Sequence, residues 1–579
     1  MPAGRIKPLS SDEHLPSRIF RVLVAVAVVA LLGFKYQLLY LQNINWDEFL
    51  FASRVFSYER GELDRPLQTI YVHLFGWIRS VPGNGIDRII AARESMFVLR
   101  LGSCVLIYLI GRRLFGKTGA WLAVLASLAF SFVLSHGEAF RADPIISLAF
   151  LAAAALLIHR PDSPYASAAA GAILGLSVLI SVKTVLYGPA VVALFAAAWL
   201  STRDQRQLVA NLAAFCLVGL MVCAVLFVVH QATLADAQPG ATIGKLLDTG
   251  ERMWAGPPAR FVEMTFDWDR AWWLLVGLGA TAAVFNLLTG SPGAKVTAVV
   301  VLALLLPLFT LTFYRNSFPY YYVCLIPPAS LAIGYLGAIV KARLASRPAM
   351  AGLVLLALFI PTVLKTTDFL AANRFDAIEP QRRLLQAVHE VFPQPVPYID
   401  RCSMVVEYPK VGLFMSTLVT GAYREAGEPL MQELVKERQP VFLLANSPGL
   451  RIEHPVEQVR RSPYRLLEVD HQYLRAHYVH HWGPIWVAGR QFELDDGIAQ
   501  TFEMPVNGPY TLESTGDVEL DGQAPGSGGV VTLESGTHLI RARGAPVSVT
   551  LRFGDHLPVP EGEPPRRALF TGLGFQTRL

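Results

Sequence analysis

The chain has 579 residues, of which 53% are hydrophobic, and its mean hydropathy is +0.41. Its apolar residues occur in long runs and do not alternate with polar ones, which excludes an ordinary soluble enzyme. The 50 Lys and Arg residues and the 45 Asp and Glu residues leave a net charge of only +5. This balance lacks the concentrated basic stripe of a nucleic-acid-binding protein, so nucleic acid is excluded as a partner.

Eleven apolar runs approach or reach the roughly 17 to 25 residues that a membrane-spanning helix needs. They lie at residues 20–42, 92–112, 118–135, 142–158, 166–182, 184–200, 208–230, 271–289, 296–313, 319–340 and 348–366. Lys183 interrupts one long apolar stretch, which we divide into a helical hairpin. The segment before the first run is polar and basic and no clear cleavage site follows, so we expect that run to be retained as a helix.

The loops between these runs predict the orientation of the protein. If the N-terminus is cytoplasmic, every inside loop carries Lys or Arg, as the positive-inside rule requires. These loops are 111–117, 159–160, 203–206, the turn that ends at Lys295, and 341–347. The odd number of helices then places everything after residue 367 outside. The five cysteines form no disulfide framework, and the Ala- and Arg-rich composition favours a bacterial cytoplasmic (inner) membrane.

The pattern changes after the last apolar run, which predicts three domains. Residues 1–366 form the transmembrane helical domain. Residues 367–495 contain two short helical and two short strand patterns, at 380–392, 396–400, 429–438 and 441–445, which are typical of an α/β unit. Residues 496–579 alternate apolar and polar positions between Gly- and Pro-containing turns, which predicts a small β-sandwich.

Two adjacent carboxylates, Asp47 and Glu48, follow the first predicted helix on its outer side and are flanked by Trp46 and Phe49. Taken alone, they are equally well explained as ordinary surface residues. A partly desolvated carboxylate at this position could also accept a proton from an attacking hydroxyl, because burial raises its basicity.

Further ionisable residues lie at the outer ends of other predicted helices. Arg141 and Asp143 open the fourth helix, Lys183 lies between the fifth and sixth, and Arg315 precedes the tenth. Ionisable groups at membrane depth are costly, so they tend to face a shared cavity and mark function. Acids together with isolated cations suit a phosphate-bearing lipid, since the cations hold the phosphate while a carboxylate activates the acceptor. We add four candidate residues of this cavity, which are His73, His136, Glu138 and Tyr320.

Two residues of the first outer loop have competing explanations. Arg65 would add a cation for the phosphate, but a surface ion pair with Asp64 or Glu62 explains it equally well. His73 is better explained as a packed interfacial histidine. The long outer loop 231–270 is a candidate lid over the cavity, although its Trp residues also suit a role as interfacial anchors.

Several short motifs occur here in the order and on the side of the membrane seen in superfamily C of the membrane glycosyltransferases (GT-C), especially its protein O-mannosyltransferase and lipid A aminoarabinose transferase branch. The likeness covers residues 20–340. The motifs are Asp47-Glu48, Arg65-Pro66, Arg141-x-Asp143-Pro144, Lys183 and the aromatic stretch 318–328. The residues after Glu48 differ from the Asp-Glu-x-Arg-Tyr of the aminoarabinose branch, so the sugar and the acceptor are not taken from it.

The resemblance implies an inverting glycosyltransferase that takes a single sugar from a polyprenyl-phosphate donor at the outer face of the cytoplasmic membrane. Carried over by position, Asp47 is the catalytic base with Glu48 as its neighbour. Asp143 is the second acidic position with Arg141 beside it, and Arg65 contacts the donor phosphate. The acceptor would be an envelope component, such as lipid A or its core, a polysaccharide or a protein.

A divalent cation stays open as a cofactor, because adjacent carboxylates could hold one, as in the oligosaccharyltransferase branch. The main alternative is a transporter or flippase of a lipid-linked sugar, which would also need cations that face a cavity. Such proteins often have repeated halves with broken helices, and this sequence shows no such symmetry. A non-catalytic assembly protein would leave the charged outer cluster unexplained.

Overall fold

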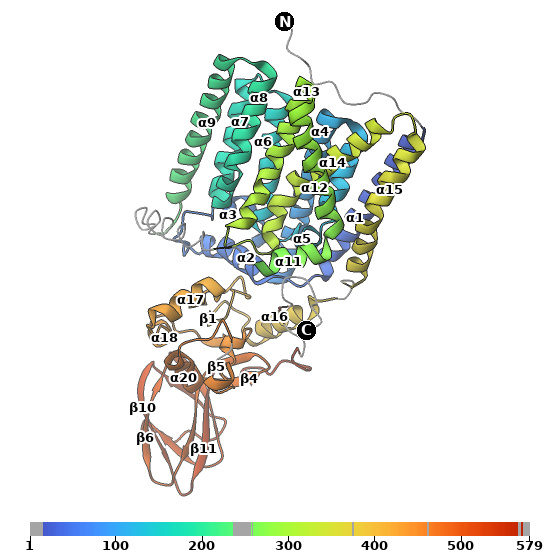
Figure 1. The fold of residues 1–579 in the computed structure, drawn as a ribbon. Helices are drawn as coiled ribbons and strands as arrows, with labels where there is room; N and C mark the ends of the chain where they lie inside the picture. The colour runs from blue at the N-terminus through green and yellow to red at the C-terminus, as the bar shows by residue number, and fades with distance from the viewer. Residues whose placement is uncertain are drawn as a thin grey trace.

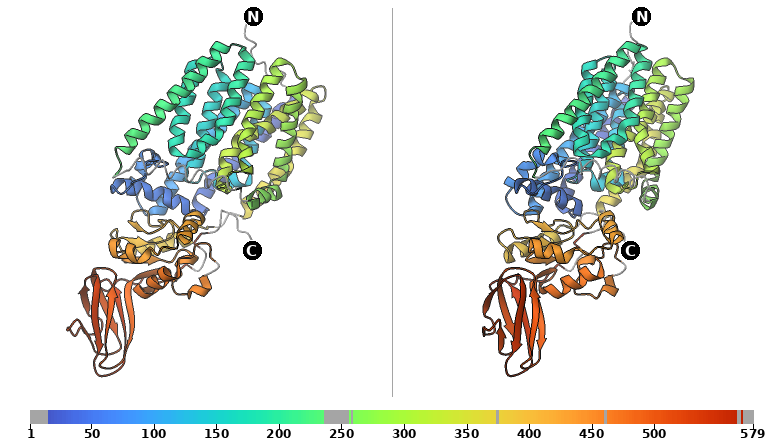
Figure 2. Two further views of the ribbon diagram at one scale, coloured as in Figure 1. Left: turned by 60° about the vertical axis from the view of Figure 1, so that its left-hand side comes forward. Right: turned by 90° about the vertical axis from the view of Figure 1, so that its left-hand side faces the viewer.

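The computed structural model describes residues 15–235, 256, 259–372, 376–459, 462–565 and 569–570. A bundle of long helices is followed by two smaller, strand-containing units that are stacked beyond one end of the bundle (Figure 1). A layer of short helices lies between the bundle and these units (Figure 2). Most of the predicted lid, including Lys245, Arg252 and Trp254, lies outside the described residues.

The long helices of the bundle correspond to the predicted apolar runs. They are α1 (Leu15–Leu41), α4 (Gly85–Leu128), α6 (Ala142–His159), α7 (Pro164–Ile180), α8 (Gly188–Thr202), α9 (Gln205–Gln231), α12 (Arg270–Thr289), α13 (Pro292–Leu305), α14 (Tyr322–Arg343) and α15 (Pro348–Ala372). Three 3-10 segments extend them, which are η2 (Val182–Tyr187), η3 (Leu306–Thr312) and η4 (Pro319–Tyr321).

Nine helical segments of the described chain are long and apolar enough to cross a membrane. One of them, α4, consists of two helices that meet at Gly116, where the backbone has φ 86° and ψ 177°. The apolar helix α7 is shorter, with 17 residues. With α4 divided and α7 added, each of the eleven predicted runs has its helix, and the hairpin predicted at Lys183 is present as α7, η2 and α8.

Glycines bring the central helices into backbone contact. A Cβ on Gly119 of α4 would lie 2.4 Å from the carbonyl oxygen of Gly334 in α14, and a Cβ on Gly334 would lie 2.4 Å from that of Gly119. A Cβ on Gly171 of α7 would lie 2.2 Å from the carbonyl oxygen of Phe215 in α9. Small residues allow this approach, which membrane helices need because dispersion contacts drive their association.

The short helices lie at the end of the bundle that faces the strand-containing units (Figures 1 and 2). They are α2 (Trp46–Glu59), α3 (Tyr71–Phe75), η1 (Gly76–Ser80), α5 (Ser131–His136) and α11 (Ala259–Trp268). A capping box begins α2, because the Asn45 side chain accepts from the N–H of Asp47 at 2.9 Å and Glu48 accepts from the N–H of Asn45 at 3.1 Å.

The unit after α15 is the predicted α/β unit. Its helices are α16 (Glu379–Val391), α17 (Thr417–Ala426), α18 (Met431–Arg438), η5 (Pro448–Leu450), α19 (Val456–Val459) and α20 (Glu468–His477). Its strands are β1 (Tyr398–Ile399), β2 (Lys410–Val411), β3 (Phe442–Leu444), β4 (Tyr478–Trp482) and the first half of β5 (Ile485–Leu494). β1 pairs in parallel with β2 and β3, and β5 runs antiparallel to β3.

The last unit is the predicted β-sandwich. Its strands are β6 (Ala499–Met504), β7 (Gly508–Ser514), β8 (Val518–Leu520), β9 (Val530–Leu533), β10 (Gly536–Ala542) and β11 (Val547–Phe553). One layer follows the order β5-β11-β7-β9 and the other β6-β10-β8, with buried side chains such as Phe492, Tyr510 and Ile540 between them. Since β5 pairs with both β3 and β11, one sheet runs through both units. The division at residue 495 stays a prediction.

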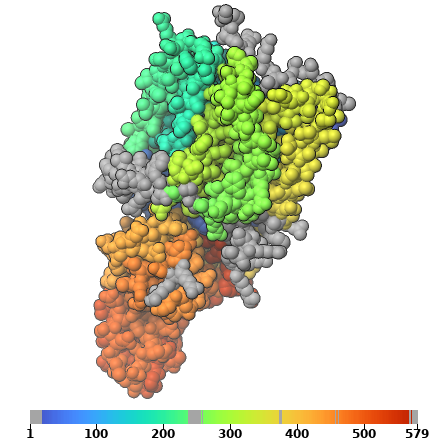
Figure 3. All heavy atoms as spheres, in the orientation of Figure 1, coloured from blue at the N-terminus to red at the C-terminus, as the bar shows by residue number. Residues whose placement is uncertain are grey.

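The α/β unit shares a hydrophobic core with the layer of short helices. This core joins residues of α2 and the start of α4, such as Phe49 and Ile89, to residues of the α/β unit, such as Val406 and Phe442. Figure 3 shows the atoms of the α/β unit directly below those of the helical part. The C-terminal half is therefore packed onto the bundle and is not attached to it by a linker alone.

Candidate functional site

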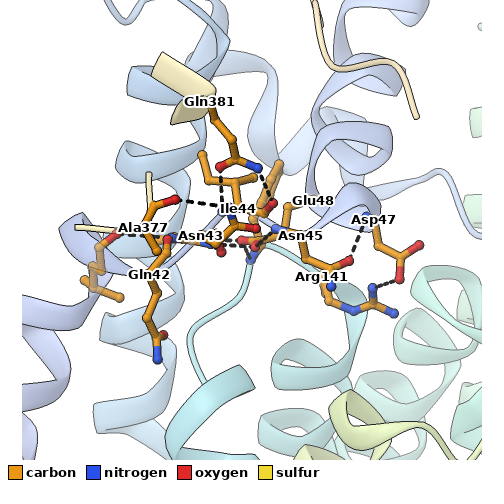
Figure 4. Close-up of polar contacts among 12 residues, drawn as sticks. Gln42, Asn43, Ile44, Asn45, Asp47, Glu48, Arg141, Ala377 and Gln381 are labelled. Carbon is orange, nitrogen blue, oxygen red and sulfur yellow. Dashed lines mark hydrogen bonds and ion pairs between the residues drawn. The ribbon is translucent and has the colours of Figure 1, made fainter. Parts of the chain in front are cut away.

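Four of the predicted site residues form one chain of charges at the end of the bundle that faces the α/β unit. Arg141 pairs through Nη1 with Asp47 Oδ2, a contact drawn in Figure 4, and its Nε lies 3.2 Å from Asp143 Oδ2. Lys183 Nζ donates to the other oxygen of Asp143 at 2.6 Å. We call these four residues the charge cluster. Its two cations balance its two carboxylates, which lets the group exist at the membrane surface.

Local structure places each member of the cluster. Asp47 belongs to the first turn of α2, Arg141 precedes α6 as its N-cap, and Asp143 lies in the first turn of α6. Lys183 projects from η2, where the chain turns between α7 and α8. Asp47 is the most open of the four, with 21% of its side chain exposed, whereas Asp143 is 2% exposed. Asp47 is thus the carboxylate that a substrate can reach.

An aromatic wall closes one side of the charge cluster. The guanidinium carbon of Arg141 lies 3.6 Å from the centre of the Tyr320 ring, and Lys183 Nζ lies 5.0 Å from the same ring. The thiol of Cys324 donates to Asp143 at 3.6 Å. Cation–π contacts of this kind orient the two cations without neutralising them. The predicted cavity residue Tyr320 therefore contacts the cluster directly.

Glu48 has different surroundings from its neighbour Asp47. Its side chain is 1% exposed and forms two bonds with Arg93 of α4, at 2.8 and 2.6 Å, while the N–H of Phe140 donates to it at 2.8 Å. Burial alone would raise the pKa of Glu48, but Arg93 and the backbone donors outweigh it, and the pKa lies below its usual range. Glu48 is thus a fully engaged carboxylate that ties α2 to α4 and to the loop before Arg141.

Glu138 lies in the loop that leads from α5 to Arg141, and its partners lie outside the charge cluster. Glu138 lies 2.5 Å from Lys35 of α1 and 3.5 Å from Arg100 of α4, and all three side chains are buried. A Cβ on Gly137 would lie 2.6 Å from the carbonyl oxygen of Val133 and 2.4 Å from Arg100 Nη2, so a larger residue there would have to displace backbone. His136 is buried at the end of α5. These contacts fix the loop that carries Arg141.

Three other predicted residues are not brought together with the cluster. Arg65 lies 3.8 Å from Asp64, and their side chains are 74% and 70% exposed, as in the surface ion pair that the sequence allowed. Arg315 is exposed between η3 and η4. His73 shares a hydrogen bond of 2.9 Å with His230 at the end of α9. No hydrogen bond or ion pair joins these three to the charge cluster within the described residues.

Sequence reasoning missed the cations that hold the site in place, which are Lys35, Arg93 and Arg100. Each lies inside an apolar run, and each is less than 6% exposed. A signal was present, because Arg93 and Arg100 are seven residues apart and therefore share one face of an apolar helix. Buried charges at membrane depth pair with one another, and here their partners are Glu48 and Glu138.

The fold resembles several solved structures, although the sequence itself matches no family model and no curated protein. A crystal structure of ArnT from Cupriavidus metallidurans bound to undecaprenyl phosphate aligns with a TM-score of 0.50 and 15% sequence identity, over 73% of this chain and 92% of that chain. The protein has a GT-C-like fold. Two other structures align less well. They are the Archaeoglobus fulgidus oligosaccharyltransferase in complex with zinc and sulfate (TM-score 0.48, 12% identity, 81% and 72% covered) and the arabinosyltransferase EmbB from Mycobacterium smegmatis (0.43, 10%, 92% and 64%).

The GT-C-like fold confirms the resemblance that the motifs predicted, at the level of the polytopic helical architecture with a strand-rich C-terminal part. The motif residues Asp47, Arg141, Asp143 and Lys183 come from three separate stretches of the sequence and meet at one place. The exception among the charged motifs is Arg65, which stays at the surface.

Proposed function

We propose that the protein is an inverting glycosyltransferase that moves a single sugar from a polyprenyl-phosphate donor to a cell-envelope acceptor. The acceptor would be lipid A or its core, a polysaccharide or a protein, and the reaction would take place at the outer face of a bacterial cytoplasmic membrane. The observation that carries this proposal is the charge cluster, in which the accessible carboxylate of Asp47 pairs with Arg141, and Asp143 links Arg141 to Lys183.

The roles in the reaction follow from the surroundings of each residue. Arg141 and Lys183 hold the donor phosphate, and Asp143 orients both cations from its buried position. When the phosphate engages Arg141, the carboxylate of Asp47 becomes free to accept the proton of the acceptor hydroxyl. The hydroxyl oxygen bonds to the anomeric carbon from the face opposite to the phosphate. The bond from that carbon to the phosphate oxygen breaks, and the phosphate keeps the electron pair.

The similar structure supports the choice of a lipid-phosphate donor, because ArnT from Cupriavidus metallidurans was crystallised with undecaprenyl phosphate. The composition of the site adds support, since a phosphate-bearing lipid needs cations at the level of the membrane surface. A divalent ion does not fit the carboxylates as they stand. Asp47, Asp143 and Glu48 each face Arg or Lys already, so no step of the mechanism passes through a metal.

The test is transfer of radiolabelled sugar from cell-extracted polyprenyl-phosphate sugars to envelope acceptors by the purified protein in liposomes. We expect Asp47→Asn to lower transfer by about 10²- to 10⁴-fold, since it removes the general base, while binding of undecaprenyl phosphate is retained. Asp64→Asn is the matched control, because Asp64 is an exposed carboxylate after the same helix, α2.

Full transfer by Asp47→Asn would refute the catalytic assignment. If the native protein carried the lipid-linked sugar across the bilayer and transferred none, the flippase alternative would replace the proposal. Transfer that depends on an added divalent ion and is abolished by a chelator would contradict the metal-free mechanism.

A further inference from the structure

The turn between α1 and α2, which leads directly to Asp47, is held by the α/β unit (Figure 4). Gln381 of α16 is 0% exposed, and its side-chain amide makes two hydrogen bonds with the backbone of Ile44. Its Oε1 accepts from the N–H of Ile44 at 2.9 Å, and its Nε2 donates to the carbonyl of Ile44 at 2.8 Å. One side chain thus satisfies both backbone groups of a residue three positions before Asp47.

A second pair of contacts holds the same turn from the segment before α16. The N–H of Ala377 donates to the carbonyl of Leu41 at 2.8 Å, and Asn43 Nδ2 donates to the carbonyl of Ala377 at 3.1 Å. Leu41 is the last residue of α1. The turn is therefore bonded to the C-terminal half at three of its four residues 41–44, which are Leu41, Asn43 and Ile44.

Arg401 of the α/β unit contacts Trp46, the first residue of α2 after the turn. Its guanidinium carbon lies 4.2 Å from the centre of the Trp46 ring and 4.1 Å from that of Tyr464, and the residue is 6% exposed. Trp46 directly precedes Asp47. No carboxylate pairs with Arg401 within the described residues, so its contact with Trp46 is a stacking contact between the two halves of the protein.

We propose that Gln381 and Arg401 are positioning residues of the active site, through which the C-terminal half aligns Asp47 with Arg141. This inference rests on the proposed function. Gln381 acts through the backbone of Ile44 and Arg401 through the ring of Trp46, and both of these residues come just before Asp47 in the chain. Because a misplacement of about 1 Å can cost roughly a hundredfold in rate, a domain that fixes this turn takes part in catalysis without supplying a reacting group.

The test replaces Gln381 with methionine, which keeps the length of the side chain and removes both bonds to Ile44. Gln386→Met is the matched control, since Gln386 is an exposed residue of the same helix. We expect Gln381→Met to lower kcat by about ten- to a hundredfold, with the Kd for undecaprenyl phosphate unchanged. Amide hydrogen exchange of residues 42–48 should rise at least about tenfold, as expected when a local closing contact is lost. The control should change neither quantity.

Arg401 supplies an independent variant. Arg401→Met should lower kcat in the same way, and Arg401→Lys should restore part of the loss, because lysine also stacks on Trp46 as a cation. Unchanged kcat and unchanged exchange in Gln381→Met and Arg401→Met would overturn the inference. The inference would also be overturned if binding of undecaprenyl phosphate fell as much as kcat, because that would indicate that the variants are generally unfolded. If the native protein transfers no sugar, the proposed function fails, and the exchange of residues 42–48 still reports whether the C-terminal half fixes the turn.

Discussion

Lys183 and Arg65 are both predicted phosphate ligands, and the structure gives them opposite surroundings. Lys183 is 15% exposed and bonded to Asp143, whereas Arg65 is 74% exposed. A buried charge-assisted bond contributes about 1.5–3 kcal/mol, while an exposed pair contributes little. We therefore expect Lys183→Met to weaken binding of undecaprenyl phosphate by roughly ten- to a hundredfold. Arg65→Gln should change it by less than about twofold. Titration of the purified protein with the lipid measures both, and an equal loss in the two variants would contradict this assignment.

Glu48 should matter for stability, with a defined pH dependence. Its pKa in the folded protein lies below the usual value of 4.5, so its contribution is present at neutral pH and is lost as the pH falls below about 4.5. Glu48→Gln leaves Arg93 buried without a charge partner and should destabilise the fold by about 3–5 kcal/mol. Thermal unfolding in detergent from pH 7 down to about pH 3 should show a smaller decrease in Tm for the variant than for the native protein.

Glu59→Gln is the control for Glu48→Gln. Glu59 is also a carboxylate of α2, but it is exposed and pairs with Arg79 at the protein surface. The control should leave the pH dependence of Tm as in the native protein. A Glu48→Gln protein that unfolded at the native temperature would show that the bond to Arg93 does not hold α2.

The sequence could predict which residues of the site are chemically unusual, but not how they pair. Asp47 and Glu48 are adjacent, and successive side chains of a helix point about 100° apart, so only one of them can face the open side. Which one does so is decided by Arg93, 45 residues away. For the same reason Arg65 remained a candidate until the structure placed it beside Asp64.

At the scale of helices and strands, the length of the apolar runs predicted the helical bundle, and the alternation of apolar and polar residues predicted the β-sandwich. Both patterns are local and therefore readable from sequence. The break in α4 is also a local feature, because Gly116 has φ 86° and ψ 177°, a conformation open essentially to glycine alone. Nothing lies within 4 Å of a Cβ at Gly116, so a substitution there tests the backbone by itself.

We expect Gly116→Ala to destabilise the protein by about 1–3 kcal/mol, because the turn between the two halves of α4 would become strained. Gly277→Ala is the control. Gly277 lies inside α12, and a Cβ there also meets nothing within 4 Å, so alanine should stabilise that helix by up to about 1 kcal/mol. Thermal unfolding of both variants measures the difference. Equal Tm values would mean that the turn at Gly116 tolerates an ordinary side chain.

At the scale of the whole molecule, the contact between the two halves was beyond sequence reasoning. Gln381 and Ile44 are 337 residues apart. No sequence pattern indicates that a glutamine of one segment bonds to the backbone of an isoleucine in another. The predicted domain boundary at residue 366 suggested a unit that follows the bundle. The structure adds that this unit shares a core with α2 and α4 and contacts Trp46, the residue before Asp47.

That contact also makes the orientation of the charge cluster testable with a single topology experiment. If each of the eleven predicted runs crosses the membrane, the start of α1 and the end of α15 lie on opposite sides. The loops after α6, α8 and α14 carry Arg160, Arg203 and Arg347. The positive-inside rule assigns those loops to the cytoplasm. Alkaline phosphatase fused after Leu579 should therefore be active in bacterial cells, and phosphatase fused after Asp162 should be inactive. The turn that leads to Asp47 is bonded to the C-terminal half at one end of the bundle. An active fusion at Asp162 with an inactive one at Leu579 would therefore place the charge cluster on the cytoplasmic side and contradict the proposed transfer at the outer face.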